Sequence, residues 1–187
     1  MKSVLISIQP KWCELIASGK KTVEVRKTRP KIDTPFKVYI YMTAGDAVYP
    51  VTINGAPYTC SNVGGKCVIG EFVCRNIYDI ECCSEDHNYF SQNGTCLTVD
   101  EIIGYCNGQD LYGWEIYDLV IYDKPKELGE FYHFCGANPE CEECEAHYYN
   151  STECGAEDYC CSVVEGYKPL TRPPQSWCYA VKGGSEK

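Results

Sequence analysis

Short segments in which apolar and polar residues alternate recur along this chain, and they limit it to a mostly-β fold. Alternation with a period of two places successive side chains on opposite faces of a strand. We expect strands over residues 4–8, 22–26, 36–41, 67–80, 114–122 and 176–181. Short strands leave unpaired sheet edges unless the sheet curls on itself. The pattern therefore predicts an α+β, mostly-β fold built on a small closed or nearly closed barrel.

One helix is expected between the first two strands. Pro10 suits the first turn of a helix, and Gly19 supplies a left-handed stop eight residues after Lys11. A second short helix is expected over residues 98–106, because Thr98 is followed by Glu101 at the spacing of a capping box. The residues that would form the apolar face of the first helix are Trp12, Leu15 and Ile16.

The chain of 187 residues is expected to be a single domain with a cysteine-rich insert over residues 135–161. Residues 43–65 are rich in Gly, Pro, Asn and Thr, which predicts a long loop or hairpin, and Gly70 is a candidate β-bulge. No apolar run approaches the length of a membrane span, and the N-terminus lacks the apolar core of a signal peptide. We therefore expect a cytoplasmic protein.

Charge is divided unevenly along the chain. Residues 1–42 carry nine Lys and Arg against three acidic residues, a balance of +6, whereas the whole chain carries a net charge of −9, which leaves −15 for the rest. This acidity argues against a general nucleic-acid coat. A local basic face that receives one phosphate-bearing ligand is one interpretation, and a solvated basic segment is the other.

Residues 19–26 have the spacing G-x-K-x-x-E-x-R, with Lys21, Glu24 and Arg26 at the charged positions. In a strand, Glu24 and Arg26 share one face, which we expect to be polar and directed away from the core side of Val23 and Val25. Two cations beside one carboxylate can hold a phosphate or the polar edge of a base. The alternative is a surface ion cluster worth about 0–1 kcal/mol per pair. For the ligand site, we expect truncation of these residues to weaken ligand binding and to change stability little, because they would lie on a polar face.

In its context of strand, helix and strand, this motif resembles the ASCH family, a branch of the PUA-like β-barrels. The resemblance extends through the strand and helix before the motif and the segments FKVYIY and VIGEF. The closing segment RPPQSWCY is similar to the end of ASCH proteins found in phages and Firmicutes. The resemblance implies a module associated with RNA.

One bacterial branch with a similar fold is an amidohydrolase of N4-acetylcytidine that uses a lysine, a threonine and a glutamate. Lys21 matches its lysine by position, but its threonine falls at Glu24, and its glutamate lies in a helical region that cannot be aligned here. The resemblance thus implies Lys21 and Glu24 as catalytic residues if the chain is an enzyme. Glu24 would then act as a general base toward water.

The fifteen cysteines are an odd number, and in a reducing compartment clustered cysteines are more often metal ligands than bridges. Cys141 and Cys144 form a C-x2-C pair, and three more thiols follow in the insert, which predicts a structural four-thiolate zinc site. A loop with free thiols, or with disulfides formed during handling, is the alternative. The remaining candidate ligands are Cys154, Cys160 and Cys161, with Cys135, His133 and His147 as substitutes. The cysteines expected to be small core residues are Cys13, Cys67, Cys74 and Cys178.

Near the C-terminus, Arg172 and Gln175 flank a Pro-Pro turn and are candidates for the rim of a ligand site. Trp177 is expected in the core rather than stacked on a base.

The sequence supports three hypotheses for the function. The first is binding of RNA, a nucleotide or a modified nucleoside by Lys21, Glu24, Arg26, Arg172 and Gln175. The second is hydrolysis of N4-acetylcytidine or a similar acylated nucleoside. The third is a phage-encoded interaction protein that blocks a host factor.

Overall fold

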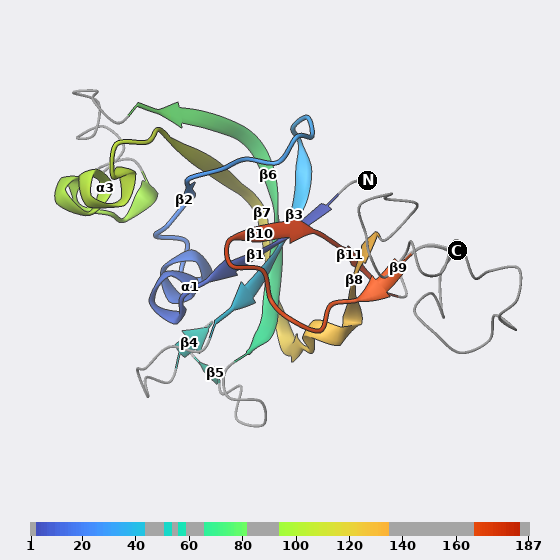
Figure 1. The fold of residues 1–187 in the computed structure, drawn as a ribbon. Helices are drawn as coiled ribbons and strands as arrows, with labels where there is room; N and C mark the ends of the chain where they lie inside the picture. The colour runs from blue at the N-terminus through green and yellow to red at the C-terminus, as the bar shows by residue number, and fades with distance from the viewer. Residues whose placement is uncertain are drawn as a thin grey trace, which may run out of the picture.

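A six-stranded sheet forms the centre of the molecule (Figure 1). The computed structural model describes residues 3–43, 51–53, 56–58, 66–81, 94–134 and 167–183. The sheet has the order β10-β1-β3-β6-β7-β2. Only β1 and β3 pair in parallel; the other neighbours are antiparallel. Its strands are β1 (Ser3–Ile8), β2 (Val23–Arg26), β3 (Phe36–Met42), β6 (Cys67–Ile80), β7 (Leu111–Lys126) and β10 (Trp177–Tyr179).

The two α-helices of the described chain have the bounds that the sequence predicted to within two residues. Helix α1 (Pro10–Ala17) connects β1 to β2, and Gly19 follows it with φ of 72°. Helix α3 (Val99–Cys106) begins with the predicted capping box between Thr98 and Glu101. Both helices lie on the same side of the molecule in Figure 1. The sequence thus specified both helix starts through a proline and a capping pair.

Smaller elements flank the central sheet. A three-stranded sheet has the order β11-β8-β9, and a short turn of 3-10 helix, η2 (Leu128–Glu130), leads into it. A two-stranded hairpin of β4 and β5 lies within the stretch predicted as a loop or hairpin. The strands concerned are β4 (Val51–Ile53), β5 (Ala56–Tyr58), β8 (Phe131–Phe134), β9 (Tyr167–Pro169) and β11 (Val181–Lys182).

The predicted bulge at Gly70 is present. The register between β6 and β7 shifts between Val68 and Gly70, where a Cβ on residue 70 would collide with the carbonyl oxygen of Val120. Further shifts follow along the same pair, and bulges increase the local twist and curvature of a sheet. This curvature gives the long β6–β7 pair the bent course seen in Figure 1.

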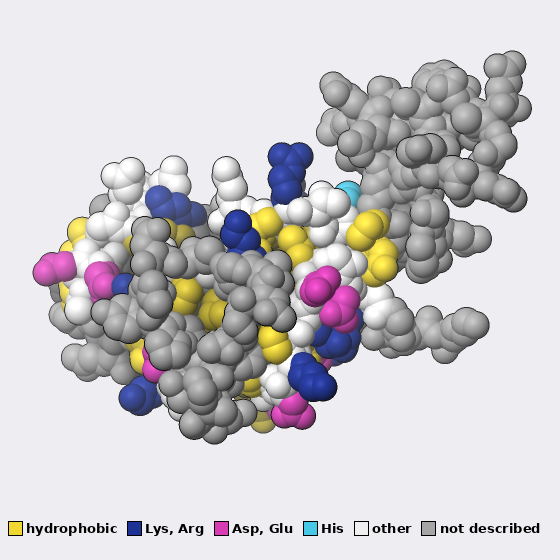
Figure 2. All heavy atoms as spheres, turned by 90° about the horizontal axis from the view of Figure 1, so that it is seen from below, with side chains coloured by type: hydrophobic (Ala, Val, Ile, Leu, Met, Phe, Trp, Pro, Cys, Tyr) yellow, Lys and Arg dark blue, Asp and Glu magenta, His cyan; other side chains and the backbone are white. Residues whose placement is uncertain are grey.

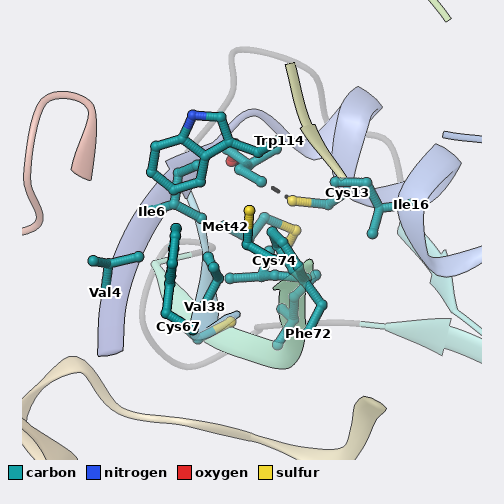
Figure 3. Packing of buried hydrophobic residues seen from close by; sticks show 14 residues of the cluster. Val4, Ile6, Cys13, Ile16, Val38, Met42, Cys67, Phe72, Cys74 and Trp114 are labelled. Atoms are coloured by element: carbon teal, nitrogen blue, oxygen red, sulfur yellow. Dashed lines mark hydrogen bonds between the residues drawn. The ribbon is translucent and has the colours of Figure 1, made fainter. Parts of the chain in front are cut away.

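Hydrophobic cores lie on both faces of the sheet, and every residue of β1 is buried. On one face, Ile6 and Trp114 pack with the buried side chains of α1, as Figure 3 shows. On the other face, Leu5 packs with Phe131 of the small sheet. The predicted core cysteines Cys13 and Cys74 are fully buried free thiols. Cys178 is a partly exposed free thiol. Cys67 is buried as predicted, and it is disulfide-bonded.

The sheet is a half-barrel whose two edges are joined by side chains. Strands β10 and β2 end the strand order, so no backbone ladder closes the barrel between them. Trp177 Nε1 instead donates to Thr28 Oγ1 at 3.0 Å, and the Tyr179 hydroxyl accepts from the Lys31 amide at 2.9 Å. Trp177 is partly buried and packs against the core. The predicted α+β, mostly-β fold is therefore confirmed, and its barrel is open between β10 and β2.

Candidate functional site

Strand β2 is buried on both of its faces. Glu24 and Arg26 are only 5% and 8% exposed, and Val23 and Val25 on the opposite face are equally covered. Lys21, just before the strand, is 2% exposed. The expectation of a solvated polar face is therefore wrong. The alternation placed the charges on one face correctly, but α1, α3 and the loop before α3 cover that face.

The charged residues of the motif form a buried ion network. Glu24 Oε1 lies 3.0 Å from Arg26 Nη2, and Glu24 Oε2 lies 3.4 Å from Lys21 Nζ. Arg26 Nη2 also donates to the Ser7 carbonyl at 2.6 Å, while Arg26 Nε is buried with no acceptor among the described residues. Such unsatisfied donors are rare in protein interiors. Two cations against one carboxylate leave an excess positive charge in this network.

A close approach of two backbone segments holds Lys21 in place. The Lys21 amide donates to the Leu15 carbonyl at 2.9 Å, and Lys21 Nζ donates to the carbonyl of fully buried Thr95 at 2.5 Å. Gly94, with φ of 83°, accepts from the Thr22 amide, and a Cβ there would collide with the Thr22 side chain. Glycine at position 94 thus lets the loop reach Lys21.

The network forms part of the wall of a cavity of about 430 Å³. This size lies within the range of small-molecule sites. Gln175 lines the cavity, because the Ser7 amide and hydroxyl bond to the carbonyls of Ser176 and Pro174 at 2.9 and 2.6 Å and hold the segment over β1. Arg172 is exposed and is not among the lining residues. The structure thus places four of the five predicted ligand residues together: Lys21, Glu24, Arg26 and Gln175.

Three further side chains of the cavity wall were missed in the sequence. Trp12 lies on α1, with Lys11 Nζ 4.0 Å and Lys21 Nζ 5.1 Å from the centre of a ring. Tyr105 and Glu101 lie on α3. The only sequence signal for Glu101 is its capping spacing to Thr98. In the structure, the hydrogen bond from the Thr98 backbone is the main cause that lowers the pKa of Glu101. Lys11 Nζ lies 3.8 Å from Glu101 Oε1, and both side chains are exposed.

Cys13 of α1 is buried, and it lies within electrostatic range of Glu24 and Arg26. Burial raises the pKa of Cys13 well above its ordinary value, and the charge of Glu24 raises it further. Its thiol donates to the Ile8 carbonyl at 3.6 Å, the dashed line in Figure 3. A neutral buried thiol is inert toward electrophiles. The residues that line this cavity carry charged groups, amides and the hydroxyls of Ser7, Thr43 and Tyr105.

Comparison with known proteins decides the family. The model of the ASCH domain matches residues 6–170. The chain belongs to the ASCH family. No curated protein matches this ASCH chain. The half-barrel and the strand–helix–strand context of the motif are thus those that the resemblance implied.

One solved structure of an ASCH protein from Zymomonas mobilis shares the fold, and two others match with lower TM-scores. A serine-to-alanine variant matches with 18% identity and a TM-score of 0.53, over 95% of this chain and 87% of that one. The unaltered protein matches with 23% identity and a TM-score of 0.48, over 68% of this chain and 74% of that one. A tyrosine-to-phenylalanine variant gives 22% identity and the same TM-score. At such identities the likeness concerns architecture alone.

Predicted features of the insert lie outside the described residues. These are the zinc ligands Cys141, Cys144, Cys154, Cys160 and Cys161. Among the residues that the structure does describe, no group of His, Cys, Asp and Glu is placed to hold a metal ion. No described helix of this ASCH protein has the length and apolar character needed to cross a membrane.

Proposed function

We propose that this ASCH protein binds a nucleoside or nucleotide unit of RNA in the cavity beside Lys21, Glu24 and Arg26. The family has a PUA-like fold that is often linked to RNA binding. The observation that carries the proposal is the buried ion network in the cavity wall, with two cations against one carboxylate. Buried charges are costly to retain for stability alone. An excess positive charge favours a ligand with acceptor or anionic groups.

The aromatic side chains of the cavity suit a base. Trp12 and Tyr105 come from two different helices and line the same cavity. Stacking of a base on an aromatic ring contributes about 1–3 kcal/mol. The amide of Gln175 supplies both a donor and an acceptor for the polar edge of that base.

The similarity of this chain to the phage and Firmicutes members of the family stays a prediction that rests on the C-terminal segment.

Hydrolysis of an acylated nucleoside is the second candidate, and one observation favours it. Glu101, a helical carboxylate, lines the same cavity as Lys21, which matches the lysine and glutamate of the amidohydrolase branch in kind. In that reaction water adds to the acyl carbon, and the C–N bond breaks to release an acid and an amine. However, both oxygens of Glu24 face cations. Holding a nucleophilic water there would weaken an ion pair, so binding is the better supported function.

The test compares Lys21→Met with Lys20→Met. Lys21 lines the cavity, whereas its neighbour Lys20 is exposed and does not. Calorimetry with ribonucleosides, ribonucleoside monophosphates and N4-acetylcytidine should show binding by the wild type and the Lys20 variant. The Lys21 variant should bind at least tenfold more weakly. Binding unchanged by Lys21→Met, or no binding by the wild type, would refute the proposal.

Turnover separates the two candidates. The wild type is incubated with N4-acetylcytidine, and release of acetate and cytidine is followed by chromatography. Under the binding proposal no product forms above the rate without protein. Product formation that Glu24→Gln abolishes while ligand binding persists would establish the hydrolase instead, with Glu24 as its general base.

A further inference from the structure

A second cavity, of about 690 Å³, lies over the loop that follows β2. Lys27, Arg29 and Lys31 line it, together with a single acidic residue, Asp33. All three cations are exposed, and none makes an ion pair within the described chain. Elsewhere the surface is mixed: Figure 2 shows cationic and acidic side chains interspersed on one face. In a chain with a net charge of −9, this cavity is a local region of opposite sign.

Side chains of β10 hold the loop that carries these cations in place. Trp177 Nε1 donates to Thr28 Oγ1, and the Lys31 amide donates to the Tyr179 hydroxyl. Pro30 between them is buried. The backbone of the loop is thus fixed, while the three cationic side chains stay exposed. A fixed backbone lowers the ordering cost of binding a ligand with repeated negative charges.

The two cavities share no lining residue, but Lys27 and Tyr105 bring their walls together. Lys27 lines the second cavity, and its Nζ lies 5.1 Å from the ring centre of Tyr105, which lines the first. Arg26 of the first cavity is the last residue of β2, and it directly precedes Lys27 of the second cavity. On the far side, Arg29 lies 5.4 Å from the ring centre of Tyr112. Cations and aromatic rings thus follow one another from the first cavity into the second.

We infer that the ligand is a single-stranded RNA whose backbone phosphates continue from the first cavity into the second, across Lys27, Arg29 and Lys31. This inference rests on the proposed function, since the first cavity supplies the unit from which the strand extends. Interleaved cations and aromatic rings are the means by which proteins follow a single strand without a duplex groove. A nucleoside alone would leave the cations of the second cavity unused. Three cations limit the contact to about three phosphates.

The experiment measures binding of a fluorescent eight-nucleotide single-stranded RNA by anisotropy, over a range of salt concentrations. The test variant is Arg29→Gln with Lys31→Gln. The matched control, Lys66→Gln with Lys124→Gln, removes the same charge from exposed positions outside both cavities. The test variant should bind at least tenfold more weakly than the control. Its slope of log K against log salt should be smaller by about 1.4, since each contacted phosphate contributes about 0.7.

Parallel measurements with Lys21→Met and with a mononucleotide separate the two proposals. Support requires that both Lys21→Met and the Arg29/Lys31 variant weaken RNA binding, and that the latter leaves mononucleotide binding unchanged. If only Lys21→Met weakens RNA binding, the second cavity is not a phosphate path, although the proposed function stands. If only the Arg29/Lys31 variant does so, the first cavity is not the nucleoside site, and the continuous path is refuted too. Equal affinity for a blunt RNA duplex would also overturn the inference.

Discussion

Glu24 and Arg26 lie two residues apart on one edge strand, and their side chains form an ion pair of 3.0 Å that is almost wholly shielded from solvent. Lys21 approaches the other oxygen of the same carboxylate. Each member of this network therefore depends on the others for compensation of its charge. Function and stability are coupled at this site, and the experiments on it must separate the two.

Replacing Glu24 by Gln should destabilise the fold. The change leaves Lys21 and Arg26 buried without a counter-charge, and breaking a buried ion pair costs about 3–5 kcal/mol. Urea unfolding followed by circular dichroism measures the change in the free energy of unfolding. Glu14→Gln, at an exposed position of α1, is the control and should stay within about 0.5 kcal/mol. If Glu24→Gln lowered the free energy of unfolding by less than about 1 kcal/mol, water would be solvating the charges of Lys21 and Arg26 in the variant.

Removing a cation together with the carboxylate should restore part of this stability. In Lys21→Met combined with Glu24→Gln, the remaining Arg26 is the only charged member of the network. We expect the double variant to be more stable than the sum of the single changes predicts, by about 0.5–3 kcal/mol. The same variant should not regain nucleotide binding, which calorimetry checks. Strict additivity of the free energies would mean that Lys21 and Glu24 do not interact.

Glu71 should contribute stability that acid removes. Burial alone would raise its pKa, but hydrogen bonds from Lys37 at 2.8 Å and from Tyr122 at 2.5 Å outweigh this, and the pKa is lowered. A lowered folded-state pKa means that the stabilisation is full above the unfolded pKa, about 4.3, and is lost as pH falls through the folded value. The difference in unfolding free energy between wild type and Glu71→Gln should be roughly 1.5–3 kcal/mol at pH 7. It should shrink below pH 4, and a difference independent of pH contradicts this account.

The thiols of Cys13, Cys74 and Cys178 should resist alkylation in the folded state. Burial raises the pKa of Cys74 to about 12 and that of Cys178 to about 11, and it raises that of Cys13 as well. At pH 8 these sulfurs are protonated, and only thiolates react quickly. Mass spectrometry after a short exposure to iodoacetamide should find the partly exposed Cys96 modified before these three thiols. Rapid labelling of Cys13 in native protein would show that α1 opens readily.

Zinc in the insert remains a prediction from the sequence. If Cys141, Cys144, Cys154 and one of Cys160 and Cys161 bind the metal, purified protein kept reduced should contain close to one zinc per chain. Because such sites contribute folding free energy, a chelator should lower the melting temperature. Elemental analysis is the measurement. If the protein contains no zinc and the chelator leaves its melting temperature unchanged, the cysteines of the insert are free thiols instead.

Local signals explain why so much of the secondary structure could be predicted. The bounds of β6 coincide with the predicted 67–80, and the capping box places the start of α3. Strand β7 extends beyond the predicted residues 114–122 at both ends. Gly113 and polar residues interrupt the alternation there, but the pairing with β6 and β2 continues. Strand pairing depends on partners distant in sequence, which a local pattern does not contain.

The burial of the site could not be predicted for the same reason. Alternation shows that Glu24 and Arg26 share a face, but it does not show what covers that face. The cover consists of Trp12, Tyr105 and the loop at Thr95, which come from three separate parts of the sequence. The charge balance of residues 1–42 indicated a basic face or a solvated basic segment, but not where in that stretch a cavity would form. The second cavity depends on β10, far along the chain.

The bond between Ser7 and Pro174 joins residues 167 positions apart, and strand β1 gains its outer neighbour β10 only through this late segment. Contacts of such separation form slowly. During synthesis at about 5–20 residues per second, roughly 8–33 s pass between the emergence of the two partners. Throughout that interval the outer edge of β1 is free to pair with a chaperone or another nascent chain. The yield of folded protein should therefore depend on how well this edge is protected until the C-terminal segment arrives.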